Sequence, residues 1–430
     1  MGQADGKEGG KGQRTVHWRH WAIWQPLADG DFFRLWLANG LWWQAMWIEM
    51  LALGWLVYDV TDSPGWVQFA AFARALPLLL FGVFSAQVVD RFRRRLIIQV
   101  VQVTNTLCIG AVTLLLWWGQ LELWHIIAFS LVSGTGWAID WPARRSLIPD
   151  LVGKERVVDA MVLENVVQSA TRISGPLLAG WVMTQLGTAG ALAVLTVTGI
   201  LTVLLLSGMK TNARAPVPPH GWRHGLQQVG EGLRFVRGKP PIWGVLLITV
   251  VMNVWTFPYM NLLPVFARDI LHQGPLGLGW LGAASGLGAS VGLVGVTFLR
   301  RRMSREWIFA GFSVLSCIGV VGFSISTTFS LAMVMLVVSG IGQAGFSTMQ
   351  SSIILLEATD EMRSRAMGAL VLAIGGGPIG RLQSGLMAEW WGAPLAVGTM
   401  AGWAGLATAG LALAVPGYLG PLWARRKKDD

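Results

Sequence analysis

Long apolar stretches alternate with short polar breaks along most of the chain. Each stretch holds about 20 residues, which is the length that an α-helix needs to cross the hydrocarbon core of a bilayer. The first six are predicted at 36–58, 65–89, 96–118, 123–140, 160–184 and 188–208, and the second six at 242–268, 275–299, 307–327, 330–355, 367–390 and 393–415. The pattern therefore predicts an all-α membrane protein with twelve transmembrane helices in two six-helix halves.

A polar stretch rich in Pro, Gly and Arg separates the two sets of spans. With the two terminal segments, we expect it to lie outside the membrane, whereas the two halves span it. The predicted parts are an N-terminal segment (1–31), an N-terminal half (32–208), a linker (209–241), a C-terminal half (242–415) and a tail (416–430).

The two halves carry matching basic loops. Arg93–Arg95 follow the second span of the first half, and Arg300–Arg302 follow the second span of the second half. Repeated halves of this kind are typical of transporters, in which the substrate site lies between the repeats near the middle of the bilayer.

Composition excludes an ordinary soluble enzyme. Of the 430 residues, 53% are hydrophobic and only 13% are charged, whereas soluble domains carry about 25% charged residues. Cys108 and Cys317 each lie inside an apolar stretch, and the sequence shows neither a phosphate-binding loop nor a metal-ligand spacing. We therefore expect a protein that is not an enzyme, uses no cofactor or metal, and binds no nucleic acid despite its net charge of +10.

Positive charge is concentrated on one side of the predicted bundle. Both terminal segments, the linker and the loops after spans 2, 4, 8 and 10 hold nearly all of the 33 lysines and arginines, while the opposite side keeps Arg268. Cytoplasmic loops carry such an excess of Lys and Arg. We therefore expect a multi-pass protein of the bacterial inner (plasma) membrane with both termini in the cytoplasm.

The end of the second span resembles a known family motif. Residues 86–95 read AQVVDRFRRR, which is similar to the major facilitator superfamily motif Gly-x-x-x-Asp-Arg-x-Gly-Arg-Arg, with Ala86 and Arg93 at the glycine positions. The resemblance implies that Asp90 closes the cytoplasmic side by docking on the other half, near the start of the eleventh helix. The implied gate consists of Asp90, Arg91, Arg94 and Arg95. The alternative is a solvated basic cluster that only sets orientation.

The fifth span contains a second segment with a family likeness. Gly175, Pro176, Ala179 and Gly180 resemble the Gly-Pro-x-x-Gly-Gly signature of proton antiporters in this superfamily. Proline bends a helix, and small neighbours permit close packing against another helix. The resemblance implies export, although ordinary close packing accounts for the same residues.

Three further stretches, 55–64, 142–151 and 360–365, strengthen the likeness. Together they look like the enterobactin-exporter and macrolide-efflux branch of the superfamily. The resemblance extends over nearly all of residues 32–415, and it implies a fold and a transport class while leaving the substrate open.

Ionisable residues lie deep within several spans. Such a group costs at least about 3 kcal/mol, so it normally faces a water-filled cavity or the bundle interior and finds a partner. Glu49 of the first span could pair with Arg74 or Arg172, either as a proton-exchanging pair or as a static salt bridge. Glu164 is the second proton-coupling candidate, and a solvated position near the cytoplasmic surface is its alternative.

Other polar and aromatic residues complete a predicted substrate cavity. Helical spacing places Gln168 on one face with Glu164 and Arg172. Arg381 departs from the small residue that the family resemblance leads us to expect, and it favours an anionic substrate. The substrate-cavity candidates are Arg74, Gln168, Arg172, Asn253, Phe257, Asn261, Gln343 and Arg381. The alternative for any single Asn or Gln is that it only joins helices.

These observations together predict a secondary transporter. We expect a monomer in the lipid bilayer that exchanges protons for a drug-like or siderophore-like small molecule by alternating access, and that exports this substrate. One alternative is an importer of the same fold. Another is a lipid scramblase or a non-transporting membrane scaffold, which would be favoured by intramembrane charges that face lipid or pair away from any cavity.

Overall fold

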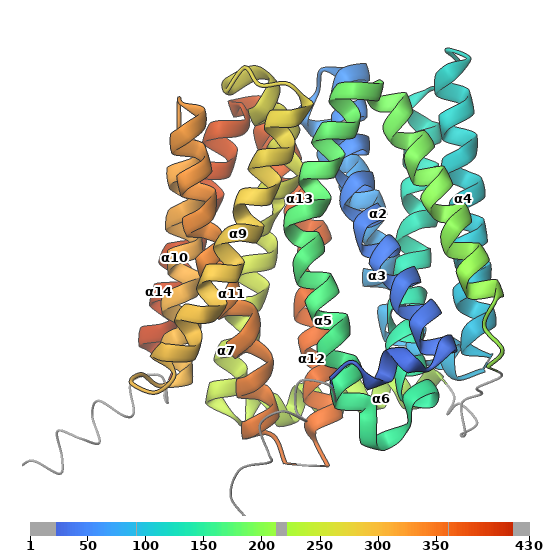
Figure 1. Ribbon diagram of the computed structural model, residues 1–430. Coiled ribbons are helices and arrows are strands. Elements are labelled where there is room, and N and C mark those ends of the chain that lie inside the picture. Colours follow the sequence, from blue (N-terminus) through green and yellow to red (C-terminus); the bar gives the residue numbers. More distant parts are fainter. Residues whose placement is uncertain (1–22, 92, 212–221, 360, 416–430) are drawn as a thin grey trace, which may run out of the picture.

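The computed structural model describes residues 23–91, 93–211, 222–359 and 361–415, with side chains for all of these except 81–91, 154 and 222–229. Within these ranges every regular element is helical, and the long helices run side by side (Figure 1). In the described part of the chain, seven helical stretches are long and apolar enough to cross a membrane by length and composition alone.

The N-terminal half begins with the short 3-10 helix η1 (Gln25–Ala28). Its long helices are α2 (Gly30–Thr61), α3 (Pro64–Arg91), α4 (Arg94–Trp117) and α5 (Leu123–Ser207). The carboxylate of Asp29 caps α2 by accepting from the backbone N–H groups of Asp31 and Phe32 at 3.0 and 2.9 Å.

Helix α5 contains three spans because it turns back at two glycines. Gly153 and Gly187 have φ of 74° and 70°, a left-handed conformation that glycine adopts without a steric penalty. The predicted end of the fourth span at residue 140 was too early, since α5 stays helical up to the turn at Gly153. The turning residue is thus much further along the chain than the end of the apolar stretch.

The C-terminal half follows the linker helix α6 (Trp222–Arg237). Its first span is irregular and consists of α7 (Pro240–Val251), the π-helix η2 (Met252–Thr256), the 3-10 helix η3 (Phe257–Leu262), α8 (Leu263–Val265) and the π-helix η4 (Phe266–Ile270). The other spans are α9 (Pro275–Leu299), α10 (Arg305–Ser324), α11 (Phe329–Glu357), α12 (Arg363–Ile374) with α13 (Gly377–Trp391), and α14 (Ala393–Ala414).

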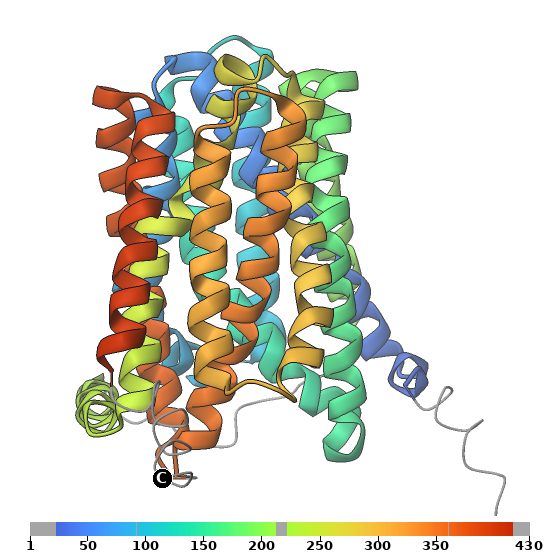
Figure 2. The same ribbon diagram turned by 90° about the vertical axis from the view of Figure 1, so that its left-hand side faces the viewer.

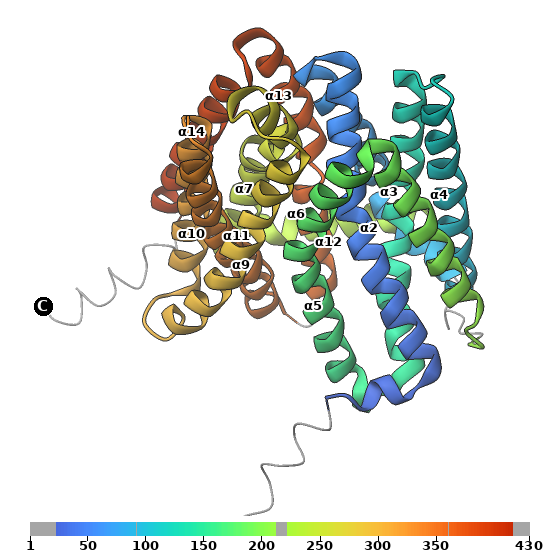
Figure 3. The ribbon, with the colours of Figure 1, turned by 45° about the horizontal axis from the view of Figure 1, so that its top comes forward.

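Across the described residues these elements make twelve spans, six on each side of α6, which confirms the predicted fold class. Figure 2 shows α6 lying across one end of the bundle, and Figure 3 shows the two halves side by side with α5 and α9 at their boundary. We call the end that carries α6 the linker end, and the opposite end the Arg268 end. The predicted five-part division of the chain stays a prediction.

The hydrophobic core differs between the two ends. One cluster joins both halves and includes Leu51 and Val57 of α2 together with Leu262 and Phe266 of the seventh span. A second cluster belongs to the C-terminal half, and a third, which includes Phe32, belongs to the N-terminal half. The shared cluster therefore joins the two halves through apolar contacts.

Candidate functional site

A cavity of about 270 Å³ lies between the two halves. Its walls come from α2, α3 and the first span of α5 on one side, and from η2, η3, α12 and α13 on the other. Most of the lining is apolar, as in typical small-molecule sites, where a few polar groups orient the ligand. The predicted residues that line this central cavity are Glu49, Arg74, Asn253, Phe257, Asn261 and Arg381.

Glu49 is held at the wall of the central cavity by two donors. The Nε atom of Arg74 donates to its Oε1 atom at 3.0 Å, and the hydroxyl of Ser133 donates to the same oxygen at 2.7 Å. The pair is partly exposed, at 16% for Glu49 and 26% for Arg74. Of the two arginines considered as partners from the sequence, the structure selects Arg74.

A glycine makes this arrangement possible. A Cβ atom added at Gly134 would lie 1.8 Å from the carbonyl oxygen of Arg74. Because any side chain would collide there, glycine at position 134 permits the close approach of the first span of α5 to helix α3. This contact places Ser133 beside the Glu49 and Arg74 pair.

Arg381 lines the opposite side of the central cavity. Its guanidinium lies near Gly377 at the start of α13, and among the described residues it has no carboxylate partner. Two guanidinium groups and one carboxylate therefore border the same cavity, which gives its charged lining a net positive charge.

The irregular seventh span supplies the polar groups Asn253 and Asn261. Pro258 has no backbone N–H group and so interrupts regular helical hydrogen bonding. The carbonyl oxygen of Pro258 accepts a hydrogen bond from the fully buried Gln68 amide of α3 at 2.8 Å. Gln68 was missed from the sequence, although a single Gln in an otherwise apolar part of a span was a signal for it.

Arg172 and Gln343 lie outside the central cavity and join the halves. The Nη2 atom of Arg172 donates to the Oε1 atom of Gln343 on α11 at 2.7 Å. Gln168 also lies outside the lining, on the same span as Arg172.

Glu164 belongs to a buried polar network within the N-terminal half. It is only 6% exposed, so the solvated alternative does not describe it. Its carboxylate accepts from the Asn39 amide at 3.0 Å and from the Trp43 indole N–H at 3.2 Å. Asn39 in turn accepts from Arg144 at 2.9 Å.

Arg144 was expected in a cytoplasmic loop, and this expectation was wrong. It is 2% exposed and donates to Asp140 at 2.8 Å and to Gln102 at 3.2 Å. The i, i+4 spacing of Asp140 and Arg144 was the available signal, because it places both side chains on one helix face.

Polar contacts also join the two halves at the Arg268 end. Arg268 pairs with Asp59 at 3.8 Å and with Asp62, while Tyr58 donates to Asp269. Nearby, Glu389 of α13 accepts from the hydroxyl of Ser63 at 2.8 Å and from the backbone N–H of Gly65 at 3.1 Å. The first group, Arg268 with Tyr58, Asp59, Asp62 and Asp269, is called the Arg268 cluster below.

The glycine and proline segment of the fifth span packs against α9 of the other half. A Cβ atom at Gly180 would lie 2.6 Å from the carbonyl oxygen of Pro275 and 3.0 Å from the Cα atom of Gly279. A Cβ atom at Gly175 would lie 2.6 Å from that of Trp47. Pro176 and Ala179 are buried in the same contact region.

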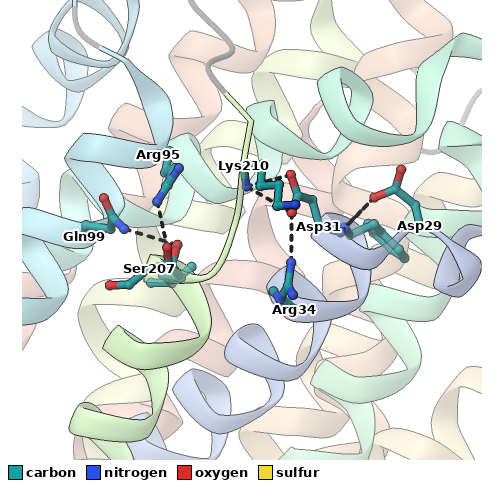
Figure 4. Close-up of polar contacts among 9 residues, drawn as sticks. Asp29, Asp31, Arg34, Arg95, Gln99, Ser207 and Lys210 are labelled. Carbon is teal, nitrogen blue, oxygen red and sulfur yellow. Dashed lines mark hydrogen bonds and ion pairs between the residues drawn. The ribbon is translucent and has the colours of Figure 1, made fainter.

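The predicted cytoplasmic gate is only partly within the described residues. Asp90 and Arg91 end α3, and their side chains lie outside the described part. Arg94 donates to Asp150 and to the carbonyl oxygen of Ser146 at 2.9 Å. Figure 4 shows Arg95 directed at the carbonyl oxygen of Ser207, at 2.8 Å. These contacts of Arg94 and Arg95 stay within the N-terminal half.

Comparison with known proteins agrees with this architecture. Residues 21–418 match the model of a family described as transmembrane secretion effectors. The chain is 24% identical over 356 residues to the multidrug efflux pump Tap of Mycobacterium tuberculosis, with 80% of this chain and 83% of the relative covered. It is 21% identical over 248 residues to macrolide efflux protein A of Streptococcus pyogenes, with 57% and 60% covered.

Solved structures share the fold at low sequence identity. A variant of the nucleoside transporter NupG superposes with a TM-score of 0.72 at 12% identity, covering 89% of this chain and 98% of that one. A bacterial homologue of the iron transporter ferroportin, in an inward-facing state, has a TM-score of 0.67 at 16% identity, with the same coverage. The resemblance seen in the sequence motifs is confirmed, and the chain belongs to the transmembrane secretion effector family of the major facilitator superfamily, whose members are membrane transporters rather than enzymes.

Proposed function

We propose that this transporter is a proton-coupled exporter of a drug-like or siderophore-like small molecule that carries an anionic group. It works by alternating access in the bacterial inner membrane, with the linker end and both termini in the cytoplasm. The observation that carries the proposal is the central cavity between the halves, where Glu49, Arg74 and Arg381 meet mostly apolar walls.

The anionic group of the substrate is inferred from Arg381. A guanidinium that is removed from water without a counter-charge is unfavourable, and a bound anion would relieve that cost. Arg74 is already neutralised by Glu49 at 3.0 Å, so Arg381 is the free positive charge of the cavity lining among the described residues. The apolar walls suit the remainder of a drug-like molecule.

Proton coupling is inferred from the Glu49 and Arg74 pair. Protonation would remove the charge of Glu49 and break its ion pair with Arg74, which would change the wall of the cavity where the substrate binds. Exchange requires that the cavity with protonated Glu49 binds the substrate less well than the cavity with the intact ion pair, so that proton and substrate occupy the cavity in turn. The alternative is a static salt bridge that only holds α2 and α3 together.

Alternating access is supported by the contacts at the Arg268 end. The shared hydrophobic cluster and the Arg268 cluster hold that end closed. Export requires these contacts to separate so that the central cavity opens to the outside. The exposed ion pairs are suited to repeated opening, because each contributes little net stability, about 0–1 kcal/mol.

Two alternatives remain for the experiment to decide. An importer would use the same fold and cavity in the other direction, whereas the relatives Tap and macrolide efflux protein A are described as efflux proteins. A scramblase or a scaffold is disfavoured because Glu49, Arg74 and Arg381 border a cavity between the halves. It would require these charges to face lipid.

The test is transport in proteoliposomes with an imposed pH gradient. Anionic, neutral and cationic compounds of similar size are compared. We expect anionic compounds to move in the direction opposite to that of the protons. Glu49→Gln should abolish the dependence on the gradient, whereas Glu155→Gln, which removes an exposed carboxylate, should not. Gradient-driven transport that survives in folded Glu49→Gln protein would contradict coupling through Glu49, and accumulation in the import direction would reverse the assigned direction.

A further inference from the structure

The buried network around Arg144 contains more negative than positive charge. Asp140 and Glu164 are 1% and 6% exposed, and Arg144 is 2% exposed. Arg144 contacts Asp140 directly and reaches Glu164 through the Asn39 amide. The other described groups that bond to this network, Gln102 and Trp43, are neutral.

Charges from neighbouring helices do not correct this imbalance among the described residues. On α2 the network meets Asn39, Trp43 and the ring of Trp42, which lies 5.1 Å from the Arg144 guanidinium carbon. On α4 it meets Gln102. With both carboxylates ionised, one guanidinium would face two buried negative charges, an arrangement that burial in a low-dielectric region makes costly.

One carboxylate oxygen of the network is also left without a partner. The Oδ1 atom of Asp140 is buried and accepts no hydrogen bond within the described structure. A buried polar atom of this kind normally has a partner. A proton on one of the two carboxyl groups would remove the excess charge of the network.

A small chamber shares lining residues with this network and with the central cavity. Its volume is about 60 Å³, which is enough for a few water molecules, since one water needs roughly 10–15 Å³. Glu49, Arg74 and Trp137 line both the chamber and the central cavity, while Gln102 of the network lines the chamber.

The chamber also offers polar groups that have no partner in the protein. The Oδ1 atom of Asn105 and the indole N–H of Trp137 are buried without a hydrogen bond in the described structure, and both residues line the chamber. Such groups would be satisfied by ordered water. Water in the chamber would therefore extend from Glu49 to Gln102, which accepts a hydrogen bond from Arg144 of the network.

We propose that Asp140 and Glu164 share one proton, forming a second proton site that exchanges with the central cavity through this chamber. The role of this site in transport rests on the proposed proton-coupled export. The presence of the proton does not depend on that proposal. Proton loss would leave a second negative charge in the network, so it should occur when water enters the chamber from the central cavity. Opening of the cavity and release of the proton are thereby linked.

Infrared difference spectroscopy of the purified full-length protein at neutral pH tests the shared proton. The carbonyl stretching band of a protonated carboxylic acid, identified by its shift in D₂O, is compared between wild type and variants. Asp140→Asn and Glu164→Gln should each lose the same single band, because either change leaves one carboxylate opposite Arg144. The double variant should lose no more than either single variant.

The controls separate this result from misfolding and from general effects. Asp140→Glu and Glu164→Asp should keep the band, and Glu155→Gln should leave it unchanged because Glu155 is exposed. No loss in either single variant, loss in only one of them, or losses that add in the double variant would overturn the shared proton. The proposal would also be overturned if a sodium ion rather than a proton balanced the charge. The wild type would then lack the band and show sodium-dependent thermal stabilisation, and both single variants would lose that stabilisation.

The outcome is independent of the transport assay. If the band behaves as expected but an imposed pH gradient drives no transport, the proton site stands and the proposed export fails. If transport is gradient-driven but the band is absent, the coupling uses Glu49 alone. If the band behaves as expected and transport is driven by the gradient, Asp140→Asn should weaken the coupling at least tenfold while substrate binding is retained.

Discussion

Arg172 of the N-terminal half donates a hydrogen bond to Gln343 of the C-terminal half at 2.7 Å. Beside it, a Cβ atom at Gly286 of α9 would lie 2.6 Å from the carbonyl oxygen of Arg172. The two halves thus meet through backbone contact and a charge-assisted hydrogen bond at the same place. A contact of this kind would exist in only some of the conformations that the proposed alternating access requires.

Gln343→Leu should shift the protein away from the observed arrangement of the halves. It leaves the partly buried Arg172 guanidinium without its acceptor, which costs about 1–3 kcal/mol. Spin labels on the two halves would report a changed distance distribution by electron-electron resonance. Gln343→Glu, which keeps an acceptor, is the matched variant and should retain the wild-type distribution. An unchanged distribution in Gln343→Leu would mean that Arg172 does not stabilise this state.

Gly180→Ala should destabilise the interface between α5 and α9. Its new methyl group would lie 2.6 Å from the carbonyl oxygen of Pro275, and such overpacking typically costs about 1–3 kcal/mol. We expect a lower thermal unfolding temperature and a faster leak of protons through proteoliposomes. Gly295→Ala is the matched control on α9, because nothing lies within 4 Å of its added carbon. Equal stability of the two variants would argue against tight packing at Gly180.

The twelve spans could be predicted from the sequence because apolar length directly reflects the thickness of the bilayer. The turns could not be placed as well. Helix α5 continues past its apolar part to Gly153, and residues such as Arg144 are buried by neighbouring helices rather than exposed in a loop. Burial of a charged residue depends on tertiary partners, and hydropathy along the chain carries no information about those partners.

The candidate site was predictable in part for the same reason. Charges within apolar spans identified Glu49, Arg74 and Arg381, which the fold brings to one cavity. The pairing of Glu49 with Arg74 rather than Arg172 depends on the directions of three helices, which no spacing along one span reveals. Ser133 was missed because a serine in a span is common and only its position opposite Glu49 makes it important.

Charge reversal at the Arg268 cluster should open the Arg268 end. In Arg268→Glu, repulsion from Asp59 and Asp62 replaces attraction, and cysteine labels placed at that end should react faster. Combining Asp62→Arg with Arg268→Glu should restore part of the wild-type protection from labelling, because the two new side chains recreate an ion pair with opposite polarity. The effect should weaken with added salt, since exposed charges are screened over about 8 Å at 0.15 M ionic strength. Labelling that is independent of both substitutions would show that the shared hydrophobic cluster alone keeps this end closed.

Arg381→Met should change substrate preference more than protein stability. Removing the guanidinium takes away the positive charge without a carboxylate partner at the central cavity, so transport of anionic compounds should fall at least tenfold, which corresponds to about 1.4 kcal/mol. A neutral compound of similar size should lose much less, and Arg381→Lys should retain part of the anion transport because it keeps the charge. Counterflow of paired anionic and neutral compounds in proteoliposomes measures the ratio directly. Because Met has a comparable length and suits apolar surroundings, the unfolding temperature should not fall. An equal loss for anionic and neutral compounds would assign Arg381 to the structure of α13 rather than to recognition of charge.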